Sequence, residues 1–243
     1  CQFRHSGVGQ IINQFSSASN SFTPVKLGIL GLPLSGKTTI FNALTRGSQP
    51  VSKSGGGGRF QVHTAVVSVP DGRVDKLSAM YKPKKTIHAQ VTYADISGVE
   101  GEQAKSGFSG PLLNQLTQLD GFLLVARAFE DDTVPHPANS LDPARDLKML
   151  ENEFVLNDLI AVERKLERLK EDGRKGIQKD KMLAAREEAL FQKLHEALSA
   201  ETPVREMDLT PDEVRLTSGY GLLTDKPLLV VFNTGEGPQD VAF

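Results

Sequence analysis

Short apolar runs and amphipathic stretches alternate along the chain. Some runs have the length and β-branched character of buried strands, and others alternate with period two like half-buried strands. The predicted strands cover 25–30, 61–69, 87–94, 121–129 and 226–232. Apolar residues at helical spacing predict helices over 39–44 and 112–119. Strands that alternate with helices indicate an α/β domain with a mostly parallel sheet.

A long charged segment interrupts this alternation. Its apolar residues recur at steps of four and three, which is heptad spacing. They are Val155, Leu159, Val162, Leu166 and Leu169, then Leu183, Leu190, Leu194 and Ala197. Because Asp172–Gly176 separates the two sets, the pattern predicts an antiparallel helical hairpin of coiled-coil type. Arms of about twenty residues would each extend roughly 30 Å.

These patterns suggest one interrupted domain. We assign 25–140 and 204–243 to an α/β domain that continues beyond its last residue, Phe243, and 141–203 to the inserted hairpin. Residues 1–24 are polar and rich in Ser, Asn and Gln, which is typical of a flexible leader or a remnant of an expression vector.

The strongest chemical signal lies between the first strand and the first helix. Gly31–Thr38 reads G-x-x-x-x-G-K-[ST], the phosphate-binding P-loop. Glycines let such a loop curl so that backbone N–H groups point at a phosphate, and the following helix adds its positive end. Lys37 is expected to reach the β- and γ-phosphates, and the Thr38 hydroxyl to bind Mg²⁺. We expect nucleotide contacts from Leu34, Ser35, Gly36, Lys37, Thr38 and Thr39.

Two later strand ends carry further candidates. Asp95-Ile96-Ser97-Gly98 has the form D-x-x-G, in which Asp95 would hold Mg²⁺ and the Gly98 N–H would meet the γ-phosphate. The last strand ends in Asn233-Thr234-Gly235-Glu236, where Ras-like proteins have N-K-x-D. Glutamate is longer than the aspartate that pairs with guanine, so Glu236 weakens the case for guanine. In those proteins the Asn braces the loop and the Asp accepts hydrogen bonds from guanine, and we expect Asn233 and Glu236 to contribute to nucleotide binding from the same positions.

Together these strings resemble the YchF/Obg-like ATPases, a branch of the translation-factor-related P-loop NTPases. Beside the P-loop, the matching strings are Phe41–Thr45, Val69–Asp71, Asp95–Gly98, Phe129–Asp131, Asp142-Pro143, Glu163-Arg164 and Asn233 with Glu236. The resemblance implies a Ras-like domain that hydrolyses ATP, or both ATP and GTP, with Mg²⁺. It also implies association with ribosomes, and a TGS domain that would lie beyond Phe243.

Turnover is expected to be slow. Many switch GTPases place a water-orienting Gln directly after D-x-x-G, whereas this chain has Val99. We therefore assign catalysis to Lys37, Gly98 and Val99, with a partner or another residue to assist. The switch threonine of the family falls near Arg59 here, and Thr64 is the nearest hydroxyl. Two alternatives stay open: a guanine-specific GTPase of ribosome assembly, and a nucleotide-dependent interaction module without hydrolysis.

Composition limits the partners. A formal charge of −2 argues against a protein that coats nucleic acid, although a local basic patch around 165–181 could contact rRNA. The single cysteine, Cys1, excludes an internal disulfide. The sequence contains no apolar run as long as a membrane span and no evident signal peptide, so we expect a cytoplasmic protein that does not bind membranes.

Overall fold

A computed structural model of the chain describes residues 24–47, 61–97, 108, 110–131, 133–176 and 180–234. They fall into two compact units, which we describe separately. The first unit is drawn from Cys1–Glu100, Leu119–Ala144 and Leu228–Phe243, and the second from Gly101–Gln118 and Arg145–Pro227. The expected leader lies outside the described residues except for Pro24. The expected ends of the inserted hairpin, at residues 141 and 203, stay a prediction.

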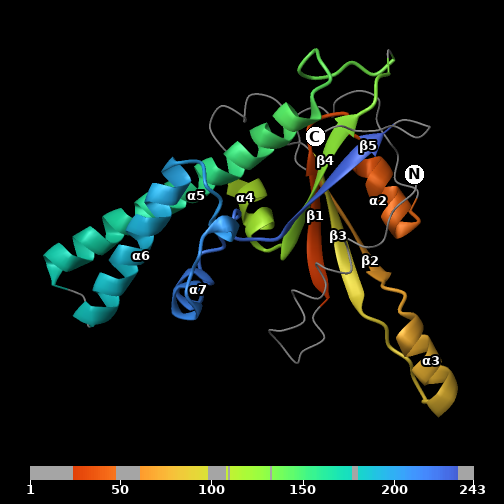
Figure 1. The fold of residues 1–243 in the computed structure, drawn as a ribbon, viewed down its shortest axis with the longest axis horizontal. Helices are drawn as coiled ribbons and strands as arrows, with labels where there is room; N and C mark the ends of the chain where they lie inside the picture. The colour runs from red at the N-terminus through yellow and green to blue at the C-terminus, as the bar shows by residue number, and fades with distance from the viewer. Residues whose placement is uncertain are drawn as a thin grey trace. The chain divides into compact units, whose positions relative to one another are not determined.

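The first unit is built on a five-stranded sheet in the order β2-β3-β1-β4-β5 (Figure 1). The strands are β1 (Val25–Gly31), β2 (Gln61–Ser68), β3 (Gln90–Ser97), β4 (Gly121–Ala128) and β5 (Leu228–Thr234). All neighbouring pairs are parallel except β2 with β3. The predicted α/β fold with a mostly parallel sheet is confirmed.

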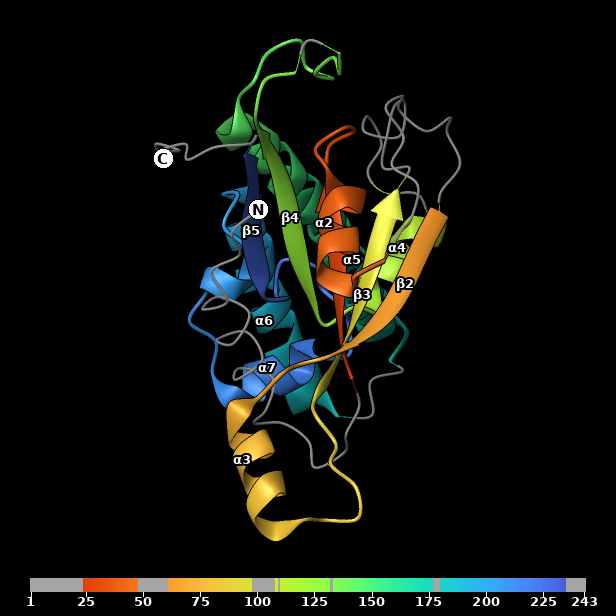
Figure 2. The same cartoon turned by 90° about the vertical axis from the view of Figure 1, so that its right-hand side faces the viewer.

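Helix α2 (Lys37–Thr45) covers one face of this sheet (Figure 2). Its Ile40 and Phe41 are buried and pack with residues of β1, β3 and β4 that alternate along each strand. Those strand residues are Leu27, Ile29, Val91, Tyr93, Leu123 and Val125. Alternation places every second side chain on the same face of a strand. The α2 face of the sheet therefore contains an apolar core directly beneath the helix that follows β1.

The second helix of this unit, α3 (Gly72–Tyr81), was not predicted, and it changes the start of a strand. The expected strand over 87–94 is in fact β3, which begins at Gln90. Residues before it belong to a segment that returns along α3, so Ile87 is 56% exposed rather than part of the sheet. The local signal for α3 was Asp71, whose side chain accepts a hydrogen bond from Arg73 N as an N-cap.

The second unit contains α4 (Gly110–Thr117), most of α5 (Pro143–Lys175), α6 (Lys181–Ser199), a short 3₁₀ helix η2 (Val204–Glu206) and α7 (Pro211–Thr217). Helices α5 and α6 lie side by side (Figure 1) and share a core. This core includes Val155, Val162, Leu190, Phe191, Leu194 and Leu198. Lys165 Nζ pairs with Glu187 Oε2 at 2.9 Å between the same helices. The helical hairpin is present, and its coiled-coil geometry stays a prediction.

Two helical regions in this unit differ from the expectation. The turn between the two helices was predicted to begin at Asp172. Helix α5 instead continues through Gly173 to Lys175, and it ends where Gly176 adopts φ 64°. No helix was predicted between the hairpin and the last strand, where the structure has α7. Thr210 and Glu213 form a capping box at its start, with Pro211 in the first turn.

A buried carboxylate ties the segment after α7 to α5. Asp158 accepts hydrogen bonds from Leu223 N at 2.8 Å, Thr224 N at 2.7 Å and Thr224 Oγ1 at 2.6 Å. Burial raises the pKa of Asp158, and these three donors oppose that effect. Among the described residues, no helix is both long and apolar enough to cross a membrane.

Candidate functional site

The P-loop connects the end of β1 to the start of α2 within the first unit. Leu34 and Gly36 adopt positive φ angles of 61° and 93°. A Cβ atom on Gly31 would lie 2.5 Å from Val125 O, and one on Gly36 would lie 2.1 Å from Asn233 Nδ2. Both glycines of the motif are therefore required by close contacts with neighbouring strands, and Gly36 also by its backbone conformation.

Lys37, the first residue of α2, is folded back across this loop. Its Nζ donates hydrogen bonds to Gly31 O at 3.1 Å and Leu32 O at 2.9 Å, and the residue is 7% exposed. The ammonium group is thus held directly over the loop backbone. A cation in this position, beside the N-terminus of a helix, is suited to a phosphate oxygen.

Thr38 and Asp95, the two residues expected to hold Mg²⁺, are in direct contact. Thr38 Oγ1 donates to Asp95 Oδ2 at 2.7 Å. Asp95 lies on β3 in register with Ile29 of the neighbouring β1, and it is fully buried. Its other oxygen, Oδ1, is buried, and none of the described residues donates a hydrogen bond to it. Such an atom is costly in an interior, so it marks a place where a ligand would be stabilising.

These two residues fit a magnesium ion of the P-loop type. Mg²⁺ binds hard oxygen ligands, and it commonly keeps water and substrate phosphates in its shell beside one or two protein groups. The hydroxyl and carboxylate pair supplies that small protein share. Within the described ranges, no group of three or more His, Cys, Asp or Glu side chains is placed to hold a metal, so a site built by protein ligands alone is not seen there.

Asn233 braces the loop from β5. Its Nδ2 donates to Ser35 O at 3.0 Å across 198 residues of sequence. Ser35 itself is 2% exposed, and its buried Oγ has no hydrogen-bond partner within the part of the chain that the structure describes. The carboxyl ends of β1, β3 and β5 therefore bring Ser35, Asp95 and Asn233 to one edge of the sheet, as expected for parallel strands.

The structure leaves part of the expected site open. Of the remaining candidates, Thr39 is exposed on α2. Gly98, Val99 and Glu236 lie outside the described residues, as does Arg59. Thr64, the nearest hydroxyl to the missing switch threonine, lies exposed on β2 in register with Ala94.

Arg127 was missed by the sequence analysis. It lies on β4 in register with Asn233 and is 3% exposed. Its Nε donates to Phe129 O at 3.1 Å and its Nη2 to Val134 O at 2.8 Å, while its guanidinium stacks 4.5 Å from the Phe129 ring centroid. Arg127 thus holds the segment after β4 beside the strand of Asn233. A lone charge in the apolar run Gly121–Ala128 was the available signal.

Comparison with known proteins agrees with the interpretation of Gly31–Thr38 as a nucleotide-binding P-loop. The Ribosome-binding ATPase YchF of Bacillus subtilis is 35% identical over 210 residues, which is 86% of this chain and 56% of that protein. Obg-like ATPase 1 of Schizosaccharomyces pombe is 33% identical over 215 residues, with 87% and 55% covered. The chain is a homologue of the YchF/Obg-like ATPases.

A solved structure supports the relationship to YchF proteins. The structure of the Schizosaccharomyces pombe YchF GTPase matches with a TM-score of 0.68 and 28% sequence identity, over 87% of this chain and 57% of that one. No protein-family model matches the chain. The chain spans little more than half the length of the YchF and Obg-like relatives named above.

Proposed function

We propose that this chain is the nucleotide-binding part of a ribosome-associated P-loop NTPase that hydrolyses ATP, and that also accepts GTP. The observation that carries the proposal is the contact between Thr38 Oγ1 and Asp95 Oδ2, beside an unpartnered buried oxygen of Asp95. A cytoplasmic location fits a partner such as the ribosome, which homologues are named for binding.

In this proposal, the chain's residues have separate tasks. Thr38 and Asp95 would hold Mg²⁺, which would neutralise charge on the β- and γ-phosphate oxygens. Lys37 would exchange a carbonyl partner for a phosphate oxygen, and the loop amides would stabilise the charge that develops during in-line attack by water. Asn233 keeps Ser35 in place, so that the loop enters the reaction already shaped.

We propose adenine rather than guanine as the preferred base on fewer observations. The two relatives described above are called ATPases, and the solved relative is called a GTPase. Asn233 is positioned at the loop, and we propose that Glu236 after it disfavours guanine. Slow turnover is proposed from Val99, which has no group to orient water.

Two measurements test the proposal. Release of phosphate from ATP and GTP is followed in single turnover with Mg²⁺, with and without ribosomes, and Lys37→Ala serves as the inactive control. We expect slow release that ribosomes accelerate and that the variant lacks. No release in either case would leave a nucleotide-dependent interaction module. In competition binding, a tenfold preference for GTP would replace ATP by GTP in the proposal.

A further inference from the structure

Helix α3 lacks the core that a helix of its length needs. None of its ten residues is buried, and even the large apolar side chains of Leu77, Met80 and Tyr81 are 54%, 72% and 76% exposed. Isolated helices of this length are marginal in water, and most helices in proteins depend on packing of an apolar face. In Figure 2, α3 extends past the end of β2 and β3.

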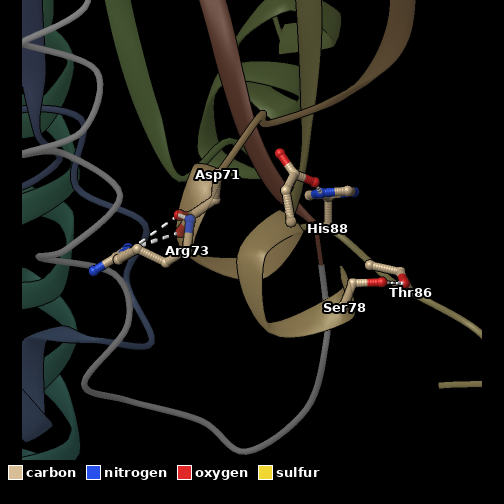
Figure 3. A network of polar contacts seen from close by, with 6 residues as sticks. Asp71, Arg73, Ser78, Thr86 and His88 are labelled. Carbon is tan, nitrogen blue, oxygen red and sulfur yellow. Dashed lines mark hydrogen bonds and ion pairs between the residues drawn. The ribbon is translucent and has the colours of Figure 1, made fainter. Parts of the chain in front are cut away.

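Polar contacts fix α3 instead. Asp71 caps its start and pairs with Arg73, whose hydrogen bonds lower the pKa of the Asp71 carboxyl to about 2. The return segment that follows the helix is tied to it twice, through Ser78 with Thr86 and through Asp75 with His88 at 3.0 Å (Figure 3). Two side-chain hydrogen bonds therefore connect the return segment to the helix.

A groove of about 270 Å³ lies between α3 and this return segment. Its lining is mainly apolar, and it includes Val74, Leu77, Tyr81, Pro83 and Ile87, together with Lys85. Ile87 is also 56% exposed. Large apolar side chains that gather on one exposed, preformed surface are typical of interaction sites.

The surroundings of the groove are basic. Residues 71–88 contain five Lys or Arg and two Asp, whereas the whole chain carries a formal charge of −2. Lys84 and Lys85 are exposed at the groove. A partner would thus meet apolar area in the centre and positive charge around it.

We propose that this groove, between α3 and Pro83–Ile87, binds an acidic protein segment whose apolar side chains enter it. Nucleic acid would need the lysines for its phosphates but would leave most of the apolar lining in water. An acidic segment with apolar anchors uses both features, because apolar anchors supply binding energy and charge complementarity supplies orientation. This site is separate from the nucleotide, so it stands or falls independently of the proposed hydrolysis.

Selection from a displayed library of random 16-residue peptides against the whole chain tests the proposal. We expect the selected peptides to combine excess Asp and Glu with large apolar residues. Their affinity, measured by fluorescence anisotropy, should fall at least tenfold on Leu77→Ser with Tyr81→Ser, and on Lys84→Glu with Lys85→Glu. All four residues are exposed, so the fold should survive, which circular dichroism verifies.

Matched changes elsewhere serve as controls. Met182→Ser with Leu183→Ser replaces two exposed apolar residues of α6 and should change affinity less than twofold. Selected peptides that bind the groove variants unchanged, or that carry no acidic excess, would overturn the proposal. So would binding of a 12-nucleotide polyuridine that needs the lysines alone, or a dimer that the Leu77 and Tyr81 changes dissociate.

Discussion

Asp95→Asn is expected to stabilise the empty protein while weakening its response to magnesium nucleotide. The fully buried carboxylate has one oxygen bound by Thr38 and one without a hydrogen-bond partner. Asparagine keeps the shape and the acceptor for Thr38, and its amide cannot carry a negative charge into the interior. Since an unsatisfied buried polar group costs about 1–3 kcal/mol, and a charged one more, the gain should be on the order of 1 kcal/mol or above. In a chain of this size that raises the melting temperature by about 2–4 °C per kcal/mol.

The second half of the prediction concerns ligand. With ATP and Mg²⁺ at about 100 times the dissociation constant, the wild type should gain about 2.7 kcal/mol of stability. Asp95→Asn should lose most of this gain, and chelation of Mg²⁺ should reduce the wild type to the same response. Differential scanning fluorimetry with EDTA, with ATP, and with both ATP and Mg²⁺ measures all three states.

Asp158→Asn is the matched control, because Asp158 is an equally buried aspartate whose oxygens accept three hydrogen bonds. An amide there would turn a donor toward donors and should destabilise the protein by about 1–3 kcal/mol. Its stabilisation by magnesium nucleotide should remain. The reasoning fails if Asp95→Asn lowers the melting temperature of the empty protein, or if it keeps the full response to Mg²⁺.

Three further outcomes follow from single contacts. Asn233→Ala removes the hydrogen bond to Ser35 O and should weaken nucleotide binding about tenfold in calorimetry, a loss of about 1.4 kcal/mol, with unchanged affinity arguing against a brace. Arg127→Met should lower the free energy of unfolding by about 2 kcal/mol or more in urea, since it frees two bound carbonyls; equal stability would mean that the segment after β4 is held otherwise. Thr210→Ala breaks the capping box of α7 and should cost about 1 kcal/mol while leaving nucleotide affinity as it was.

The sequence predicted the elements whose signals are local and strongly apolar. Strands β1, β4 and β5 are each found within two residues of the expected runs, because continuous apolar runs of this length are typical of strands in a parallel sheet. Helix α3 was not predicted from the sequence. None of its residues is buried, and it is rich in polar residues, so it lacks the strong apolar signal of the other elements. The end of α5 was misjudged at Gly173, since one glycine lowers helix propensity by only about 1 kcal/mol and packing can override it.

Within the candidate site, the spacing of the motif predicted the residues of the continuous loop Gly31–Thr38. Thr38 and Asp95 were paired through a motif, and their contact is now seen in the geometry. The motif predicted that Asn233 braces the loop, but its contact with Ser35 could not be named, because it depends on the register of β5 with β4 and of β4 with β1. Arg127 lies in the same register opposite Asn233, so its lone charge could mark it as unusual in the sequence but could not show which segment it holds.

The unfavourable features of the nucleotide site gather at the same place. Leu34 holds a left-handed backbone, which is rare for a residue with a side chain, and the buried oxygens of Ser35 and Asp95 have no hydrogen-bond partners. All three features cost stability in the protein without ligand, and a nucleotide with its cation would offer partners to the two oxygens. A loop that served only packing would be more stable with apolar residues in place of Ser35 and Asp95. Their presence at one sheet edge, beside a buried lysine, is therefore better explained by a ligand than by the core.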